Sequence, residues 1–184
     1  MNTVAFFALY YMVGVLKIEP ALAGTLIFIT KLFDVITDPL VGRWSDRLRV
    51  PGSRRRPFLL VGAIVSPLAF LMIFTTPIFE AQAFTAAYIF TAMLVYTLGY
   101  TLFNVPYISM PAEMTDDYHE RSRIHGVRMI FVSFAGILAG AGVPALLDTL
   151  GRKNWDAYAT VGQIGAAIIF LSMMSAWWGT RSAR

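Results

Sequence analysis

The sequence contains no cysteine and little charge. Without cysteine among its 184 residues, disulfides and thiolate-bound metals are excluded. Only 14% of the residues are charged, whereas soluble domains carry about a quarter. The two histidines, His119 and His125, have no metal-ligand motif around them. We also find no catalytic triad, no phosphate-binding glycine loop and no HExxH motif, so we expect neither an enzyme nor a resident cofactor.

Apolar residues are abundant where charged residues are few. They are 57% of the chain and give a mean hydropathy of +0.63. They occur in long blocks, the pattern of an integral membrane protein with several spans. The net charge of +4 is concentrated in one loop, so it gives no reason to expect a nucleic-acid partner.

Six membrane segments are predicted, at residues 3–16, 20–44, 57–76, 82–111, 120–148 and 157–179. The first segment has only 14 residues, whereas a spanning helix needs about 20, so we expect it to be the end of a longer helix. No soluble domain or linker interrupts the series. We therefore predict an all-α fold, a single six-helix membrane bundle over residues 1–184. Gly136 and Gly140, four residues apart, predict a close helix contact.

Arginine predicts the orientation. Six arginines lie between the second and third segments, namely Arg43, Arg47, Arg49, Arg54, Arg55 and Arg56. The next link, residues 75–82, has no lysine or arginine. By the positive-inside rule the arginine-rich link is cytoplasmic, and counting spans places both termini there, in a plasma (inner) membrane.

A polar stripe crosses the second apolar segment. Lys31, Asp34 and Asp38 follow an i, i+3, i+7 spacing and fall within an arc of about 60° on one helix face. A carboxylate in hydrocarbon is costly and normally faces a partner, an ion or a water-filled cavity. The stripe therefore indicates movement of an ion or a solute.

Two sets of residues resemble a known family. Residues 31–47, KLFDVITDPLVGRWSDR, are followed by GSRRRPF at 52–58; residues 100–107, YTLFNVPY, are followed by MTDDYHERSR at 114–123 and by Arg128. In order and spacing they resemble the glycoside–pentoside–hexuronide:cation symporters, the melibiose-permease-like branch of the major facilitator superfamily. Members have two six-helix bundles with the solute between them. The resemblance implies the N-terminal bundle, with a truncated first helix and an absent C-terminal bundle.

The resemblance also implies a coupling-ion site. Asp34 and Asp38 match the acids that coordinate Na⁺ or accept H⁺, and Thr37 and Thr101 match neighbouring positions of that site. Carboxylates one turn apart can share a cation, or their repulsion can favour proton binding by one of them. The alternative is a structural polar cluster in which Lys31 neutralises Asp34.

A sugar site is implied beside it. Asn104 and Arg128 match positions that face the sugar, with Tyr100 and Ile108 nearby, and we group Lys31 of the polar stripe with them. Melibiose permease itself has an acid at the position of Asn104 and a tryptophan at that of Ile108, so galactoside specificity is not expected. For Arg128 the alternative is an ion pair with Asp34 or Asp38.

The cytoplasmic loop motif of the superfamily is matched as well. Its residues here are Gly42, Asp46, Arg47, Arg54, Arg55 and Arg56. In the family these charges form state-dependent contacts between bundles. Anchoring of the three consecutive arginines to anionic headgroups is the alternative.

The sequence thus supports cation-coupled (Na⁺ or H⁺) symport of a sugar or glycoside as the leading hypothesis. The partners would be the solute, the cation, membrane lipid, and a missing C-terminal bundle or a second copy. The alternative is a transport-inactive half-bundle or partner subunit. A third possibility is a lysolipid cargo, since a eukaryotic branch of similar fold carries lysolipids.

Overall fold

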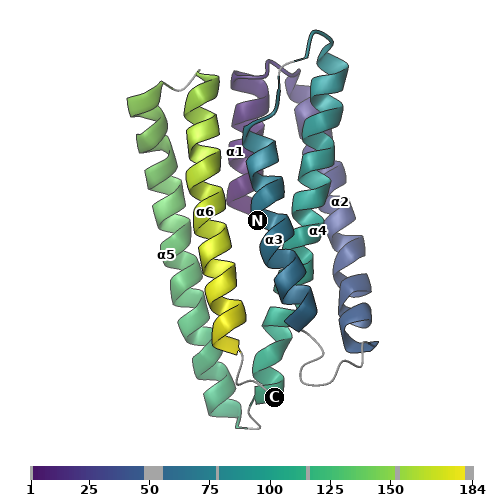
Figure 1. The fold of residues 1–184 in the computed structure, drawn as a ribbon, viewed down its shortest axis with the longest axis vertical. Helices are drawn as coiled ribbons and strands as arrows, with labels where there is room; N and C mark the ends of the chain where they lie inside the picture. Colours follow the sequence, from purple (N-terminus) through teal and green to yellow (C-terminus); the bar gives the residue numbers. More distant parts are fainter. Residues whose placement is uncertain (1, 48–55, 78, 115–116, 152–153, 181–184) are drawn as a thin grey trace.

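The computed structural model describes residues 2–47, 56–77, 79–114, 117–151 and 154–180. Within these ranges it has six α-helices, which stand side by side in one bundle (Figure 1). They are α1 (Asn2–Gly14), α2 (Pro20–Arg47), α3 (Arg56–Phe74), α4 (Gln82–Met114), α5 (Tyr118–Leu150) and α6 (Trp155–Gly179). The predicted all-α, six-helix fold is confirmed, and the predicted segment ends differ from the observed ones by up to three residues.

The helices suit a bilayer. In the described ranges, α2 to α6 are long and apolar enough to cross a membrane, whereas α1 has 13 residues. Along α5 the large apolar side chains are open to the outside, with Phe131 and Ile137 each 69% exposed. Such a surface is unfavourable in water and favourable in lipid.

Local sequence explains where several helices begin. Proline is favoured in the first turn of a helix, and α2 starts at Pro20. The carboxylate of Asp117 accepts a hydrogen bond of 2.9 Å from the His119 N–H at the start of α5. Asn154 caps α6 in the same way through the Asp156 N–H, at 3.2 Å. These caps satisfy N–H groups that have no partner within the helix.

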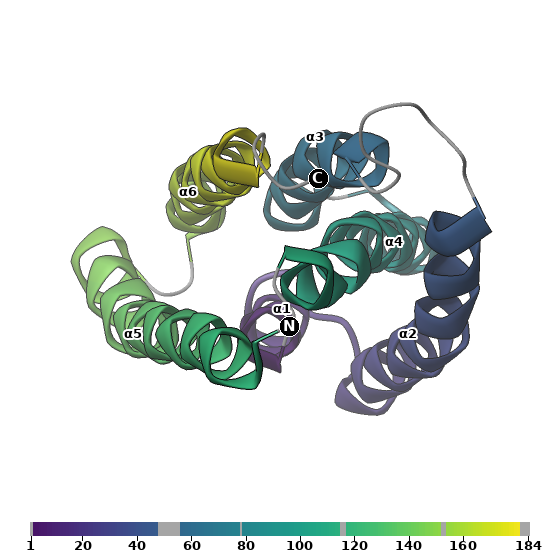
Figure 2. The same cartoon turned by 90° about the horizontal axis from the view of Figure 1, so that it is seen from below.

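Helix α4 occupies the centre of the bundle. It packs along α3 and α2, and α3 in turn packs along α6 (Figure 2). Buried aromatic rings join α1 to α3 and α6: the ring centroids of Tyr11 and Tyr158 are 4.9 Å apart and those of Tyr11 and Phe74 are 5.7 Å apart. These ring contacts hold α1 against the α3 and α6 side of the bundle.

Glycine permits the closest helix contacts, but not where the sequence predicts. A Cβ on Gly136 or Gly140 would meet nothing within 4 Å, because the surface of α5 is largely exposed. A Cβ on Gly62 of α3 would lie 2.7 Å from the backbone nitrogen of Phe103 and 2.8 Å from the carbonyl oxygen of Gly99, both on α4. The close contact predicted on α5 is therefore found between α3 and α4 instead.

Replacing Gly62 should separate these two helices. We expect Gly62→Ala to lower the free energy of unfolding by about 1–3 kcal/mol, because the added methyl group meets α4 backbone that cannot move aside. Gly136→Ala is the matched control, and it should leave stability unchanged or raise it by up to about 1 kcal/mol. Thermal unfolding in detergent measures both. Equal effects of the two substitutions would contradict the α3–α4 packing described here.

Candidate cation site and solute cleft

Buried hydroxyl groups line the interface between α2 and α4. Thr30, Thr37 and Ser45 are the buried polar residues of α2. Each donates a hydrogen bond to its own helix, to the carbonyl oxygens of Leu26 (2.8 Å), Phe33 (2.9 Å) and Gly42 (2.8 Å) respectively. Helix α4 presents the buried hydroxyls of Thr97 and Thr101. Small hydroxyl residues allow close helix approach, and among these five the Thr97 hydroxyl is buried without a hydrogen-bond partner in the described part of the chain.

Both aspartates of α2 meet one residue of α4. The Thr101 hydroxyl lies 3.1 Å from Oδ1 of Asp38 and 3.3 Å from Oδ1 of Asp34. A hydroxyl has a single hydrogen, so it donates to one carboxylate at a time. The structure thus brings three predicted cation-site residues together around one atom.

Exposure differs across this group. Thr101 is 1% exposed, Asp34 is half-buried and Asp38 is exposed. The carboxylates therefore stand at the edge of the α2–α4 interface. Lys31 is close enough to act electrostatically on Asp34. Three oxygen ligands and two negative charges are suited to a small hard cation or a proton.

Thr37 takes a different position. Its hydroxyl donates to the carbonyl oxygens of Phe33 (2.9 Å) and Asp34 (3.2 Å) on its own helix. Its buried side chain packs into the bundle, and no described hydrogen bond joins it to either carboxylate. Helix geometry explains the difference, because adjacent residues such as Thr37 and Asp38 point in different directions.

A cleft opens between α4, α5 and α6. Its volume is about 1050 Å³, and it lies at the end of the bundle where α4 and α6 finish and α5 begins (Figure 1). Four predicted solute-site residues line it: Tyr100, Asn104, Ile108 and Arg128. The structure brings these together, and the volume suffices for a small solute.

Arg128 of α5 reaches across the cleft to α4. Its Nη2 donates to the side-chain oxygen of Asn104 at 3.2 Å, and its guanidinium lies 5.6 Å from the centre of the Tyr107 ring. Its described contacts do not include an ion pair with Asp34 or Asp38. Helix α4 lies between α2 and α5 (Figure 2), and Tyr100 on α4 is close enough to Arg128, Asp34 and Asp38 to interact electrostatically with all three.

Tyr107 is a site residue that the sequence analysis missed. Besides meeting Arg128, its ring is stacked on Phe103, with centroids 5.5 Å apart and planes at 28°. Tyr107 also lines the cleft. The signal was present, because Tyr100, Asn104 and Tyr107 follow an i, i+4, i+7 spacing that places them on one helix face. The ionisable residues Glu120, Arg123 and His125, which also line the cleft, were missed as well.

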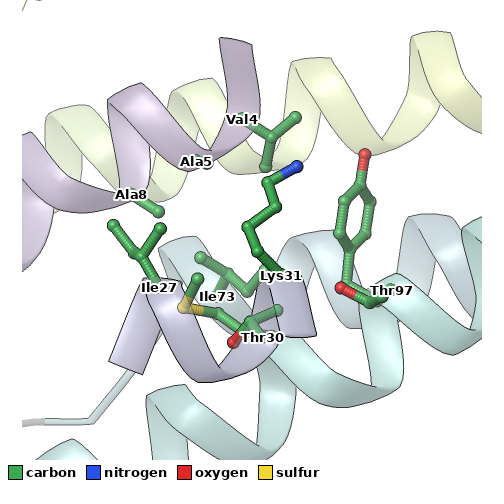
Figure 3. Close-up of a pocket in the computed structure, with 10 residues that line it drawn as sticks. Val4, Ala5, Ala8, Ile27, Thr30, Lys31, Ile73 and Thr97 are labelled. Atoms are coloured by element: carbon green, nitrogen blue, oxygen red, sulfur yellow. The ribbon is translucent and has the colours of Figure 1, made fainter. Parts of the chain in front are cut away.

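Lys31 lies outside the cleft. It lines a separate cavity of about 20 Å³, where it extends from α2 toward α1 beside Val4 (Figure 3). Thr30 and Thr97 also line this cavity. Such a volume holds about one water molecule and no solute. The structure therefore groups Lys31 with the carboxylates of α2 and not with the other predicted solute-site residues.

The predicted gating residues lie at the end of the bundle where α2 finishes and α3 begins. Asp46 and Arg47 are exposed in the last turn of α2, and Gly42 lies against Val105 of α4. Arg56 opens α3 with its guanidinium 5.1 Å from the centre of the Trp177 ring on α6. Arg54 and Arg55 fall outside the described residues.

Comparison with known proteins identifies relatives along the whole chain. Residues 1–184 match the family described as MFS/sugar transport protein. The putative glycoside/cation symporter YagG of Escherichia coli is 33% identical over 90% of this chain and 37% of its own length. The uncharacterized symporter YnaJ of Bacillus subtilis is 31% identical over 89% of this chain and 36% of its own length. A glucuronide carrier protein homolog of Escherichia coli is 31% identical over 70% of this chain and 28% of its own length.

The chain spans about a third of the length of these curated relatives. The family match, however, covers every residue and agrees with the all-helical, membrane-spanning structure. This is a multi-pass integral membrane protein and not an enzyme, and it belongs to the MFS/sugar transport protein family.

Proposed function

We propose that this chain forms one bundle of a cation-coupled symporter for a sugar or glycoside. The contact of Thr101 with both Asp34 and Asp38 carries the proposal. Two carboxylates held within a membrane bundle around one hydroxyl are costly unless a cation or proton binds there. Na⁺ or H⁺ at this position would neutralise repulsion between the carboxylates and favour the packing of α2 against α4.

The cleft supports the solute part of the proposal. Asn104 and Arg128 offer hydrogen-bonding groups, and Tyr100 and Tyr107 offer aromatic faces on the same wall. Sugars are bound by such combinations of polar groups and rings. The name of the relative YagG, a putative glycoside/cation symporter, agrees with this assignment.

Ion and solute sites meet in α4. The Thr101 hydroxyl contacts the carboxylates of α2. Asn104, about 60° around the helix, lines the cleft and accepts a hydrogen bond from Arg128. Cation binding that draws α2 onto α4 would therefore alter the wall of the solute cleft. By linkage, a solute that prefers the resulting arrangement raises cation affinity by the same factor.

A second bundle would complete the transporter. We propose that it comes from a longer chain or a second copy, because the exposed Asp38 and the open cleft leave polar surface uncovered. The arginine-rich end, with Arg47, Arg56, Arg121 and Arg123, would face the cytoplasm. Asp46 and Arg47 would there contact the second bundle.

Asp38→Asn tests the cation site. In the purified chain in nanodiscs, we expect Na⁺ to raise the unfolding temperature relative to choline at equal ionic strength. At a Na⁺ concentration a hundredfold above Kd, the free energy of unfolding should increase by about 2.7 kcal/mol. If H⁺ is the ion, lowering the pH without Na⁺ should have that effect. Asp38→Asn should abolish either response, since one of the two charges is lost.

Glu19→Gln is the control for that experiment. Glu19 is an exposed acid in the link between α1 and α2, so its removal should leave the cation response intact. A full response in Asp38→Asn would refute the proposed site.

Thr101→Val tests the shared oxygen. We expect cation affinity to fall about tenfold, because one ligand is lost from a buried position. Thr101→Ser should restore the affinity, since it keeps the hydroxyl. Thr91→Val is the matched control on the same helix: its exposed hydroxyl donates only to the Ala87 carbonyl, at 2.8 Å. Isothermal titration with Na⁺ compares the three, and equal affinities would exclude Thr101 as a ligand.

Tyr107 should support solute binding through Arg128. Tyr107→Leu removes a cation–π contact of about 0.5–2 kcal/mol and should weaken glycoside affinity roughly two- to thirtyfold. Tyr107→Phe keeps the ring and should bind nearly as well as the unaltered chain. Tyr118→Leu, which removes an exposed ring at the start of α5, should have no effect. Calorimetric titration of the glycoside measures these affinities; if the Phe variant is as impaired as the Leu variant, the ring contact is not responsible.

A further inference from the structure

We propose that Lys31 makes the cation site of α2 specific for a single monovalent cation and weakens its binding of divalent cations. This inference rests on the proposed function and names the residue that sets the ion class of that same site. It starts from the charges that share one face of α2.

Three charged side chains lie on that face. Lys31 precedes Asp34 by three residues and Asp38 follows Asp34 by four, so each step is close to one helical turn. Asp38 and Lys31 both act electrostatically on Asp34, and their effects have opposite signs. Two carboxylates and one ammonium leave this group with a net charge of minus one.

Helix α1 confines the Lys31 side chain beside this group. Lys31 is half-buried, and it extends from α2 toward α1 (Figure 3). The cavity that it lines, of about 20 Å³, is also lined by Val4, Ala5 and Ala8 of α1. Such a cavity leaves room for about one water molecule, so the positive charge stays close to the carboxylates.

A net charge of minus one matches one monovalent cation. Charge that is left uncompensated in a membrane bundle is costly. Na⁺ or H⁺ at Asp34 and Asp38 brings the group to neutrality, whereas a divalent cation leaves it with a net positive charge. Without Lys31 the two carboxylates would suit a divalent ion such as Ca²⁺, which prefers oxygen ligands of that kind.

Two other positive charges near the site can be controlled. The amino terminus of the chain acts on Asp34 more weakly than Lys31 does. A peptide tag joined to residue 1 removes the terminal ammonium from this position. Arg128 contacts Asn104 and Tyr107 on the cleft side of α4, and its charge is present in every Lys31 variant. Its effect therefore cancels when these variants are compared.

Competition between ions tests this inference. In the tagged chain in phosphatidylcholine nanodiscs, Na⁺ should raise the unfolding temperature. At concentrations that saturate this response, Ca²⁺ should neither raise the unfolding temperature nor displace Na⁺. If the chain responds to H⁺ instead, the pH dependence of unfolding replaces the Na⁺ measurement.

Lys31→Gln should change both affinities, but to different extents. We expect the affinity for Na⁺ to rise roughly tenfold and the affinity for Ca²⁺ roughly a hundredfold. The factor for Ca²⁺ is the square of the factor for Na⁺, because Coulomb energy is proportional to the charge of the bound ion.

Three further variants separate charge from structure. Lys31→Arg keeps the positive charge and should keep the weak binding of Ca²⁺. Lys17→Gln removes an exposed lysine from the link between α1 and α2, and it should change neither affinity. Adding Asp38→Asn to Lys31→Gln should abolish the gained Ca²⁺ response, because the bound Ca²⁺ then lacks one of its two carboxylates.

Stabilisation of the unaltered chain by Ca²⁺ as strong as that by Na⁺ or H⁺ would overturn the inference, and this measurement needs no variant. Unchanged affinities in Lys31→Gln, equal factors for the two ions there, or the same Ca²⁺ affinity in Lys31→Arg as in Lys31→Gln would overturn it too. In each of these cases the proposed cation site would remain. Absence of any Na⁺ or H⁺ response in the unaltered chain would overturn that site itself.

Discussion

Helix α4 carries polar side chains on two of its faces that contact polar side chains of neighbouring helices, and the polar sites of the bundle depend on this arrangement. In hydrocarbon every donor and acceptor needs a protein partner or a ligand. Thr101 meets the requirement on the side of α2 by contacting two carboxylates. Asn104 meets it on the side of α5 by accepting a hydrogen bond from Arg128. The proposed ion site and the proposed solute site therefore share one helix.

Helix α4, which carries both proposed sites, is packed closely against α3. Gly62 and Gly99 let α3 and α4 approach until a single methyl group would collide with backbone. Packed interfaces of this kind shift between discrete arrangements and resist gradual deformation. Under the proposed function, a change at the carboxylates would reach the cleft through α4, because this helix carries residues of both sites.

Much of the fold followed from local sequence. Hydropathy located six helices, because a bilayer imposes both length and composition on each span. Local capping by Asp117 explains why α5 starts at Tyr118. The spacing of Asp34 and Asp38 predicted one polar face, since helix geometry relates residues three and four apart. Which glycines make close contacts did not follow: Gly136 and Gly140 have the expected spacing, yet they face open space because α5 has few neighbours.

The sequence by itself determined the membrane-spanning helices, the polar stripe of α2 and the family, because these depend on residues close together in the chain. Only the tertiary structure decided which polar residues meet. It brought Thr101 to the carboxylates and Arg128 to Asn104 and Tyr107, and it placed Lys31 in a separate cavity. The contacts of Thr101 and Arg128 join residues 21 to 67 positions apart. They depend on how whole helices pack against one another, which no local pattern encodes.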